Sequence, residues 1–173
     1  MTDTEKSQRH EKRMKRQKTI IDDKITEATI DKGLLLVITG NGKGKSSSGF
    51  GMVAHALGHT MKVGVVQFIK GAYSTGEEAF FRRFPEEVEY HVVGDGFTWD
   101  TQNLQQDIAS AEAGWEICRK MLASPEIDVV LFDELNIVLK MHYLDMEKVL
   151  NDIASRPKQQ HVIITGRGAP ERV

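Results

Sequence analysis

Short apolar runs alternate along the chain with longer segments in which apolar residues recur every three or four positions. The apolar runs predict buried strands over residues 34–38, 62–69, 88–93, 128–134 and 161–165. Several of these runs are almost entirely Val, Ile and Leu. That composition is typical of strands covered on both faces, as they are in parallel sheets.

The segments between the predicted strands have the pattern of amphipathic helices. They predict helices over residues 45–57, 77–84, 103–122 and 146–154. The longest of them carries an apolar stripe that includes Trp115, which we expect in the core rather than in a site. Strands that alternate with helices predict an α/β fold, with a mostly parallel sheet and helices on both of its faces.

The first 30 residues have a different composition. Residues 4–18 contain seven Lys or Arg and two Glu, and their one apolar residue is Met14. We expect a basic N-terminal helical arm over residues 1–30, with a short helix at residues 22–29, and one α/β domain over residues 31–173. The sequence leaves the role of the arm open between a solvated tail, an arm ordered by an anionic ligand or a partner subunit, and contact with nucleic acid.

Composition narrows the class of protein. A formal net charge of −2 gives no reason to expect a general nucleic-acid binder. The single cysteine, Cys118, excludes an internal disulfide, and no apolar run approaches the ~20 residues of a membrane span. The six histidines show no metal-ligand spacing. We therefore expect a cytoplasmic protein with no membrane segment and no zinc site.

A glycine-rich turn joins the first predicted strand to the helix that follows it. The turn has the sequence Thr39-Gly40-Asn41-Gly42-Lys43-Gly44-Lys45-Ser46-Ser47. Glycines let the backbone come close to a ligand, and the N–H groups of the next helix end bind anions. Its last residues match the pattern G-x-x-x-x-G-K-[ST] of polyphosphate-binding loops, in which Lys45 would supply charge and Ser46 a ligand for Mg²⁺. That pattern places glycine at position 39, where this chain has Thr39.

Two other predicted strand ends and one loop carry candidate site residues. Asp133 and Glu134 end a strand, where they would either serve a metal site or cap the next helix. Arg167 follows the last strand, where it would either reach a phosphate or lie at the surface. Phe97 and Trp99 lie in a glycine-bounded loop and either cover the core or form a platform for a flat ligand.

These segments together resemble a known family, the P-loop ATP:cob(I)alamin adenosyltransferases, which are the corrinoid adenosyltransferases of cobalamin biosynthesis. The similar blocks are the glycine-rich turn and residues 63–71, 96–99, 133–135 and 162–168, in the same order. The displaced first glycine, Gly40, is also a property of that family. The resemblance runs from about residue 30 to the end, and it implies a P-loop NTPase-like (RecA-like) fold.

The resemblance implies that the Co(I) centre of a reduced corrinoid, cobalamin or cobyrinic acid a,c-diamide, attacks C5′ of ATP and that triphosphate leaves. Lys45 would act in catalysis together with Phe97 and Trp99, which would line the lower face of the corrin and displace its axial ligand. Mg²⁺ or Mn²⁺ would be held by Ser46 and Glu134. The ATP-binding residues would be Gly40, Asn41, Gly42, Lys43, Gly44, Lys45, Ser46, Ser47 and Arg167.

The resemblance also implies a homodimer, in which the N-terminal arm closes over a nucleotide site, and reduced flavodoxin or flavin as the electron donor. Family members usually have threonines where this chain has Ser46 and Ser47, and often an arginine where it has His55. They also continue through another helix and strand, so we expect a C-terminal element to be missing from these 173 residues.

Two other functions remain open on the residues alone. One is a P-loop ATPase or kinase that transfers the γ-phosphoryl group, for which Glu134 is the candidate base. The other is a nucleotide-regulated nucleic-acid binder that uses the basic arm.

Overall fold

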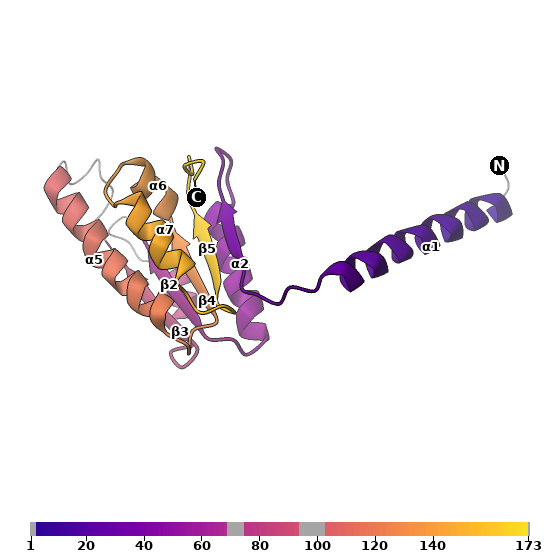
Figure 1. The fold of residues 1–173 in the computed structure, drawn as a ribbon, viewed down its shortest axis with the longest axis horizontal. Helices are drawn as coiled ribbons and strands as arrows, with labels where there is room; N and C mark the ends of the chain where they lie inside the picture. Colours follow the sequence, from indigo (N-terminus) through magenta and orange to yellow (C-terminus); the bar gives the residue numbers. More distant parts are fainter. Residues whose placement is uncertain (1–2, 69–74, 94–102, 173) are drawn as a thin grey trace. The chain divides into compact units, whose positions relative to one another are not determined.

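The computed structural model describes residues 3–68, 75–93 and 103–172. The chain divides into two compact units, Met1–Asp31 and Lys32–Val173. The first contains one long helix, α1 (Asp3–Glu27), in which no residue is buried. The second contains a sheet with helices on both faces (Figure 1).

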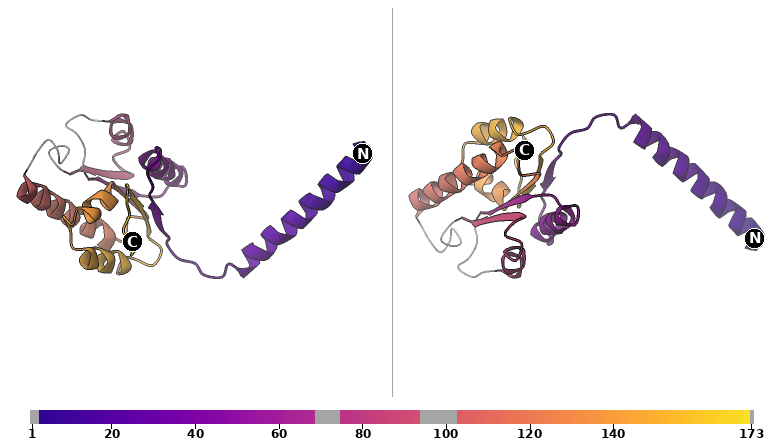
Figure 2. Two further views of the ribbon diagram at one scale, coloured as in Figure 1. Left: turned by 90° about the horizontal axis from the view of Figure 1, so that it is seen from above. Right: turned by 90° about the horizontal axis from the view of Figure 1, so that it is seen from below.

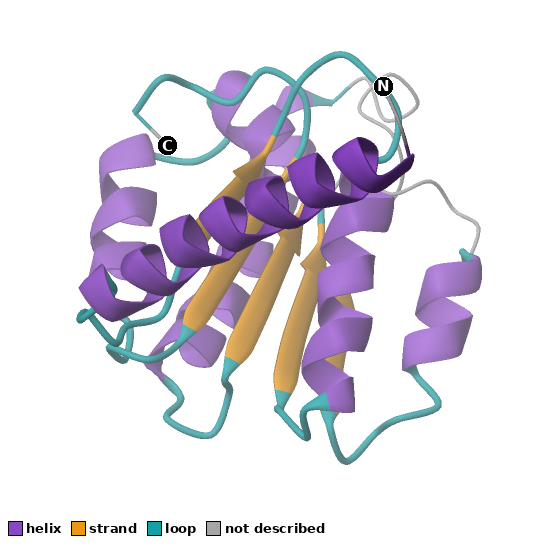
Figure 3. Cartoon of the chain, turned by 90° about the vertical axis from the view of Figure 1, so that its right-hand side faces the viewer, coloured by secondary structure: helices purple, strands orange, loops and turns teal. Residues whose placement is uncertain are grey.

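The sheet of the second unit has five strands, and every described pair is parallel. The spatial order is β1-β5-β4-β2-β3. Figure 3 shows the strands running in the same direction, so that their carboxyl ends meet at one edge. The strand bounds are β1 Leu35–Ile38, β2 Val63–Gln67, β3 Val88–Val92, β4 Val129–Asp133 and β5 His161–Thr165. The predicted α/β fold with a parallel sheet is confirmed.

Helices cover the two faces of the sheet in two groups (Figure 2). One face carries α2 (Lys45–Gly58) and α3 (Gly76–Phe81). The other carries α5 (Leu104–Ala123), α6 (Leu135–Lys140) and α7 (Met146–Ala154). Each group packs on its own cluster of buried apolar side chains.

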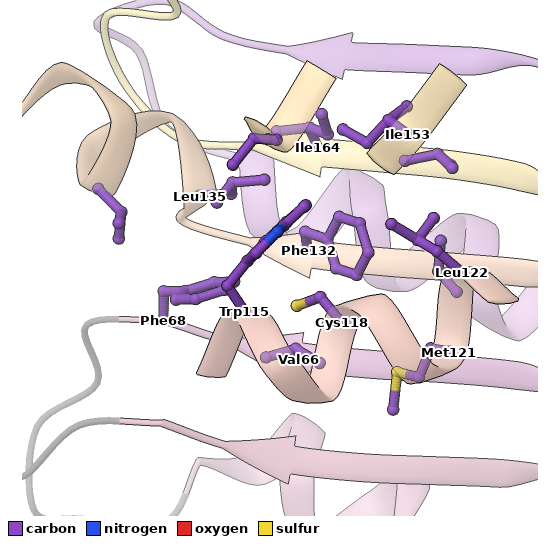
Figure 4. Close-up of a cluster of buried hydrophobic side chains, with 14 of the residues drawn as sticks. Val66, Phe68, Trp115, Cys118, Met121, Leu122, Phe132, Leu135, Ile153 and Ile164 are labelled. Carbon is purple, nitrogen blue, oxygen red and sulfur yellow. The ribbon is translucent and has the colours of Figure 1, made fainter. Parts of the chain in front are cut away.

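Alternation along the central strands divides their side chains between these two clusters. In β4, Val130 and Phe132 face the α5 side, whereas Val129 and Leu131 face the α2 side. Both sets are buried, because a strand in the middle of a covered sheet has no solvent face. The predicted core position of Trp115 is confirmed: its ring meets Phe132 edge-on at 5.6 Å, within the cluster drawn in Figure 4.

Two elements differ from the sequence-based expectation. The short helix expected at residues 22–29 is the end of the 25-residue helix α1. Residues with good intrinsic helix propensity and pairs such as Glu11–Lys15, 2.6 Å apart, favour a helix even without a buried face. The six-residue helix α6 was not predicted, because so short a segment shows too little of the helical period.

No helix in residues 3–68, 75–93 or 103–172 is long and apolar enough to cross a membrane.

Candidate functional site

The candidate site lies at the edge of the sheet where the strands end. Among the connections that leave this edge, the structure describes three in full: residues 39–44 after β1, Glu134 after β4, and residues 166–168 after β5. Every glycine with positive φ in the described residues lies in two of these loops, and they are Gly40, Gly44, Gly166 and Gly168. The sheet thus brings together segments that are far apart in the sequence.

The loop after β1 is open above its backbone. Gly40 and Gly44 have φ of 112° and 97°, values that favour glycine. A Cβ added at Gly40, Gly42 or Gly44 would have no neighbour within 4 Å. Gly44 is the N-cap of α2 and supplies no side-chain cap, so the N–H groups of the first helical turn remain available to an external acceptor.

Lys45 and Ser46 are the half-buried side chains of this loop, and Asn41, Lys43 and Ser47 are exposed. The Lys45 ammonium donates to the carbonyl of Gly42 at 2.5 Å, so its charge is held beside the loop. A loop of this shape, with a lysine charge and a helix N-terminus, suits a chain of phosphates.

The residue that departs from the usual phosphate-loop pattern has a structural partner. The Thr39 hydroxyl accepts a hydrogen bond from the backbone N–H of Ala169 at 3.1 Å. Glycine at this position could not make that bond. Thr39 therefore ties the phosphate loop to the loop that carries Arg167.

Asp133, at the end of β4, is buried with 4% of its surface exposed. Its Oδ1 accepts from the Thr165 hydroxyl at 2.6 Å, and its Oδ2 accepts from Gln67 Nε2 at 2.9 Å. Both carboxylate oxygens therefore have partners inside the protein. This carboxylate therefore stabilises the end of β4 by linking it to β5 and β2.

Glu134 has a different environment. It is the N-cap of α6 but makes no side-chain capping bond, and its backbone is left-handed with φ of 63°. Its Oε2 is buried, and no hydrogen-bond partner occurs for it among the described residues. Burial, followed by the Asp133 charge, raises the pKa of the Glu134 carboxyl, while Lys45 and Arg167 lower it. A buried oxygen without a partner, close to two cations, suits a ligand that supplies positive charge.

Arg167 is exposed in the loop after β5, between two glycines of positive φ. The backbone at Gly166 packs closely on the β4 end: an added Cβ would lie 2.9 Å from Asn136 Cβ and 3.2 Å from Glu134 Oε2. Gly166, the neighbour of Arg167 in the chain, therefore lies beside Glu134, and the charges of Arg167 and Lys45 both act on the Glu134 carboxyl group.

The predicted site residues are thus only partly brought together. The glycine-rich loop, Glu134 and Arg167 share one edge of the sheet. Phe97 and Trp99 lie outside the described residues. Their predicted role as a platform for a flat ligand stays a prediction.

Sequence reasoning missed a buried hydrogen-bond chain behind the site. Tyr90 donates to Gln67 Oε1 at 2.5 Å, and Gln67, Asp133, Thr165 and the N–H of Glu134 continue the chain. One signal was available: Gln67 is a polar residue at the end of an otherwise apolar strand, at the edge where ligands bind.

Comparison with known proteins then identifies the family. Residues 31–173 match the family described as ATP:corrinoid adenosyltransferase BtuR/CobO/CobP. The chain belongs to this family. The resemblance stated from the sequence is thereby confirmed.

Individual relatives agree with that assignment. A corrinoid adenosyltransferase of Pseudomonas aeruginosa is 65% identical over 165 residues, which are 95% of this chain and 81% of that protein. A corrinoid adenosyltransferase of Escherichia coli is 44% identical over 161 residues, or 93% of this chain and 81% of that protein. The corrinoid adenosyltransferase CobA of Salmonella typhimurium is 43% identical with the same coverage. Membership of an adenosyltransferase family favours adenosyl transfer over the phosphoryl-transfer and nucleic-acid alternatives.

Proposed function

We propose that this protein transfers the 5′-deoxyadenosyl group of ATP to the Co(I) centre of a reduced corrinoid, cobalamin or cobyrinic acid a,c-diamide. The cobalt electron pair attacks C5′ and becomes the new Co–C bond. The C5′–O bond breaks, and triphosphate leaves with the electron pair of that bond. The observation that carries the proposal is the open phosphate loop, joined to Lys45 and an uncapped helix end, in a chain that matches the family over residues 31–173.

The phosphate loop suits triphosphate as a leaving group. In this reaction negative charge grows on the phosphate oxygen next to C5′ as the bond breaks. Fixed N–H groups and a lysine charge that already face the phosphates stabilise this charge without reorganising. We assign this role to residues 40–47, with Lys43 and Lys45 as the cations and Arg167 as a further contact from the loop after β5.

The side chains present fit a hard divalent cation, Mg²⁺ or Mn²⁺. Such ions prefer oxygen ligands and commonly bind through one or two protein oxygens together with substrate phosphates. Ser46 has a hydroxyl at the start of α2, and Glu134 has a buried carboxylate oxygen without a hydrogen-bond partner in the described residues. We infer that these two residues hold the metal, which would neutralise phosphate charge when bound.

The corrinoid-facing part of the site rests on the family resemblance. We propose that Phe97 and Trp99 line the lower face of the corrin and keep its axial ligand away, so that the cobalt can be reduced to Co(I). Electrons would come from a reduced flavodoxin or flavin.

We also propose a cytoplasmic homodimer with a P-loop domain over residues 31–173 and a basic arm over residues 1–30. The arm would close over a nucleotide site. Helix α1 supports this proposal because it exposes Met14, Ile21 and Ile25 at helical spacing, and the first two line a shallow groove with Gln17 and Lys18. An apolar stripe on a helix without buried residues needs a partner surface.

The decisive experiment is an anaerobic incubation with ATP, Mg²⁺ and chemically reduced cobalamin. The visible spectrum should show light-sensitive adenosylcobalamin, and triphosphate should accumulate in equal amount. A reaction without reductant is the control and should give neither product. Corrinoid-stimulated ADP in place of triphosphate would contradict the proposal and favour phosphoryl transfer.

The proposed role of Trp99 has its own test. Trp99→Ala should reduce activity far more in assays that start from Co(II) than in assays supplied with Co(I), because the residue is assigned to the reduction step. Trp115→Phe is a control for a core tryptophan, since Trp115 packs on Phe132 and donates to Asp152. Equal losses in both assays for Trp99→Ala would assign that residue a structural role.

A further inference from the structure

Thr165 lies between the two acidic residues of the β4 end. It is the last residue of β5 and is fully buried. Its hydroxyl donates to Asp133 Oδ1 at 2.6 Å and accepts from the backbone N–H of Glu134 at 3.0 Å. The Thr165 side chain of β5 thus forms hydrogen bonds with two consecutive residues at the end of β4, Asp133 and Glu134.

The direction of these bonds is fixed by the residues behind them. Tyr90 donates to Gln67 Oε1, so Gln67 turns its Nε2 towards Asp133 Oδ2. The carboxylate of Asp133 can only accept, and it therefore takes the single hydroxyl proton of Thr165. A lone pair of that hydroxyl is then left for the N–H of Glu134.

The bond to Glu134 falls at a strained point of the backbone. Glu134 has φ of 63° and ψ of 15°, and a left-handed conformation is costly for a residue with a Cβ. Such conformations persist where the surrounding structure holds them in place. The Thr165 hydroxyl is the side-chain group that bonds the N–H of this residue.

The same turn sets the direction of the Glu134 carboxyl group. That group does not cap α6, and its Oε2 is buried beside Gly166, where an added Cβ would lie 3.2 Å away. The positive charges of Lys45, in the phosphate loop, and of Arg167, in the loop after β5, also act on this group. Since Oε2 has no hydrogen-bond partner among the described residues, the backbone turn determines where the carboxyl group points.

We propose that Thr165 is a positioning residue for the nucleotide-bound metal ion: its hydroxyl holds the backbone turn that presents the Glu134 carboxylate to that ion. The proposal rests on the proposed function, in which Glu134 is a metal ligand. Groups that orient metal ligands commonly change metal affinity or activity by roughly 10- to 100-fold when they are removed.

The test compares Thr165→Val with Thr165→Ser. Valine keeps the volume and loses the hydroxyl, whereas serine keeps the hydroxyl and loses the methyl group that lies next to Gly49. The readout is the gain in ATP affinity on adding Mn²⁺, as the ratio of dissociation constants measured in EDTA and in Mn²⁺, without corrinoid. This ratio reports how much the protein contributes to holding the metal.

In the wild type we expect Mn²⁺ to tighten ATP binding. Thr165→Val should reduce that gain about tenfold or remove it, whereas affinity in EDTA stays within about twofold. Thr165→Ser should keep most of the gain. In a Glu134→Gln background, Thr165→Val should have no further effect on the ratio, since the two residues act through one interaction.

A purely structural role for Thr165 is tested by Ile163→Val. Ile163 is on the same face of the same strand and is buried, and this change removes a methyl group without touching the hydrogen bonds. Ile163→Val should leave the Mn²⁺ gain unchanged even if its melting temperature falls as much as that of Thr165→Val. Equal loss of the gain in Ile163→Val, or a full gain in Thr165→Val, would overturn the proposal.

The outcome is separable from that of the proposed function. A wild-type protein that forms adenosylcobalamin, with Mn²⁺ gains that are equal in the wild type and in Thr165→Val, overturns only the role of Thr165. A wild-type protein that forms no adenosylcobalamin overturns the proposed function, and the Mn²⁺ ratios still decide for or against Thr165.

Discussion

The phosphate loop and the β4–β5 end form two halves of one site by different means. The phosphate loop, residues 39–47, faces outward and uses backbone groups, with open space above Gly40, Gly42 and Gly44. The β4–β5 end, which we define as residues 133–134 and 165–168, is held by buried side chains of several strands. Because of this difference, we expect substitutions in the phosphate loop to affect mainly nucleotide binding and the rate of adenosyl transfer. Substitutions in the β4–β5 end should also lower the stability of the fold.

Replacing the loop lysine should have the largest effect. Lys45→Ala removes the positive charge that is held on the carbonyl of Gly42 in the phosphate loop. The loss of one preorganised donor of this type lowers rates by about 100- to 1,000-fold. We expect kcat/KM for adenosyl transfer to fall by that factor in an anaerobic assay, with little change in melting temperature. Lys62→Ala is the matched control, because Lys62 pairs with Glu126 on the surface. A loss of less than about fivefold would contradict the role assigned to Lys45.

The glycines of the two halves should respond differently to alanine. Both Gly40 and Gly166 have positive φ, so alanine at either position is strained by about 1–3 kcal/mol. Gly166→Ala also brings a Cβ within 2.9 Å of Asn136 Cβ, whereas Gly40→Ala meets nothing within 4 Å. Urea unfolding should therefore show a larger loss of stability for Gly166→Ala.

The control for both glycine variants is Gly51→Ala. Gly51 lies within α2, is exposed, and has no neighbour within 4 Å of an added Cβ. Alanine should stabilise the helix there by about 0.5–1 kcal/mol. Equal destabilisation by Gly40→Ala and Gly166→Ala would remove the distinction between the two halves.

A smaller effect is expected at the buried acid. Asp133→Asn keeps the shape but turns an NH₂ group towards Thr165 or Gln67, each of which donates to the wild-type carboxylate. The loss of a buried hydrogen bond costs about 1–3 kcal/mol, and for a domain of this size each kcal/mol lowers Tm by about 2–4 °C.

Asp145→Asn is the matched control, since Asp145 caps α7 and asparagine caps nearly as well. Thermal unfolding should distinguish the two variants. An equal Tm for Asp133→Asn and Asp145→Asn would show that the Asp133 bonds contribute little to stability.

The smallest expected effect is the change of folding stability with pH that Glu134 causes when no metal ion is bound. Burial raises the pKa of the Glu134 carboxyl, with Asp133 as the second cause. Ionising Glu134 is therefore harder in the folded than in the unfolded state, and stability decreases as the pH rises through the folded-state pKa. In EDTA at pH 8, Glu134→Gln should unfold at higher urea than the wild type, and the difference should shrink at mildly acidic pH.

Ser46→Ala provides the comparison in the phosphate loop and should show no such pH dependence. If Glu134→Gln were less stable than the wild type at pH 8, the charges of Lys45 and Arg167 would outweigh burial at this carboxyl group.

Much of the fold could be predicted because local patterns carry it. The bounds of α7 and β5 agree with the sequence-based ranges, since clear apolar periods mark these elements. The length of α1 and the presence of α6 could not be predicted in this way. Helix α1 buries no residue, and Met14 is the one apolar residue between positions 4 and 18, so the apolar period is too sparse to mark the start of the helix. Helix α6 has only six residues.

The site could be predicted where one contiguous segment forms it. Residues 40–47 predict a phosphate loop because all of its parts follow one another in the sequence, at the spacing that the loop requires. The separate roles of Asp133 and Glu134 could not be predicted, since they depend on Thr165 from another strand and on a left-handed turn. The hydrogen bond that Thr39 accepts from Ala169 likewise could not be predicted, because the two residues are far apart in the sequence.

The pairing of β1 has a consequence for how the enzyme is made. Among the described strands, β1 pairs with β5 alone. Leu35 lies opposite Val162, although almost the whole sequence of the domain separates these two residues. During synthesis, at about 5–20 residues per second, the ribosome therefore finishes the phosphate-loop segment many seconds before its neighbouring strand exists. A nascent chain that has not reached β5 carries the complete loop sequence but has no sheet position in which to fix it.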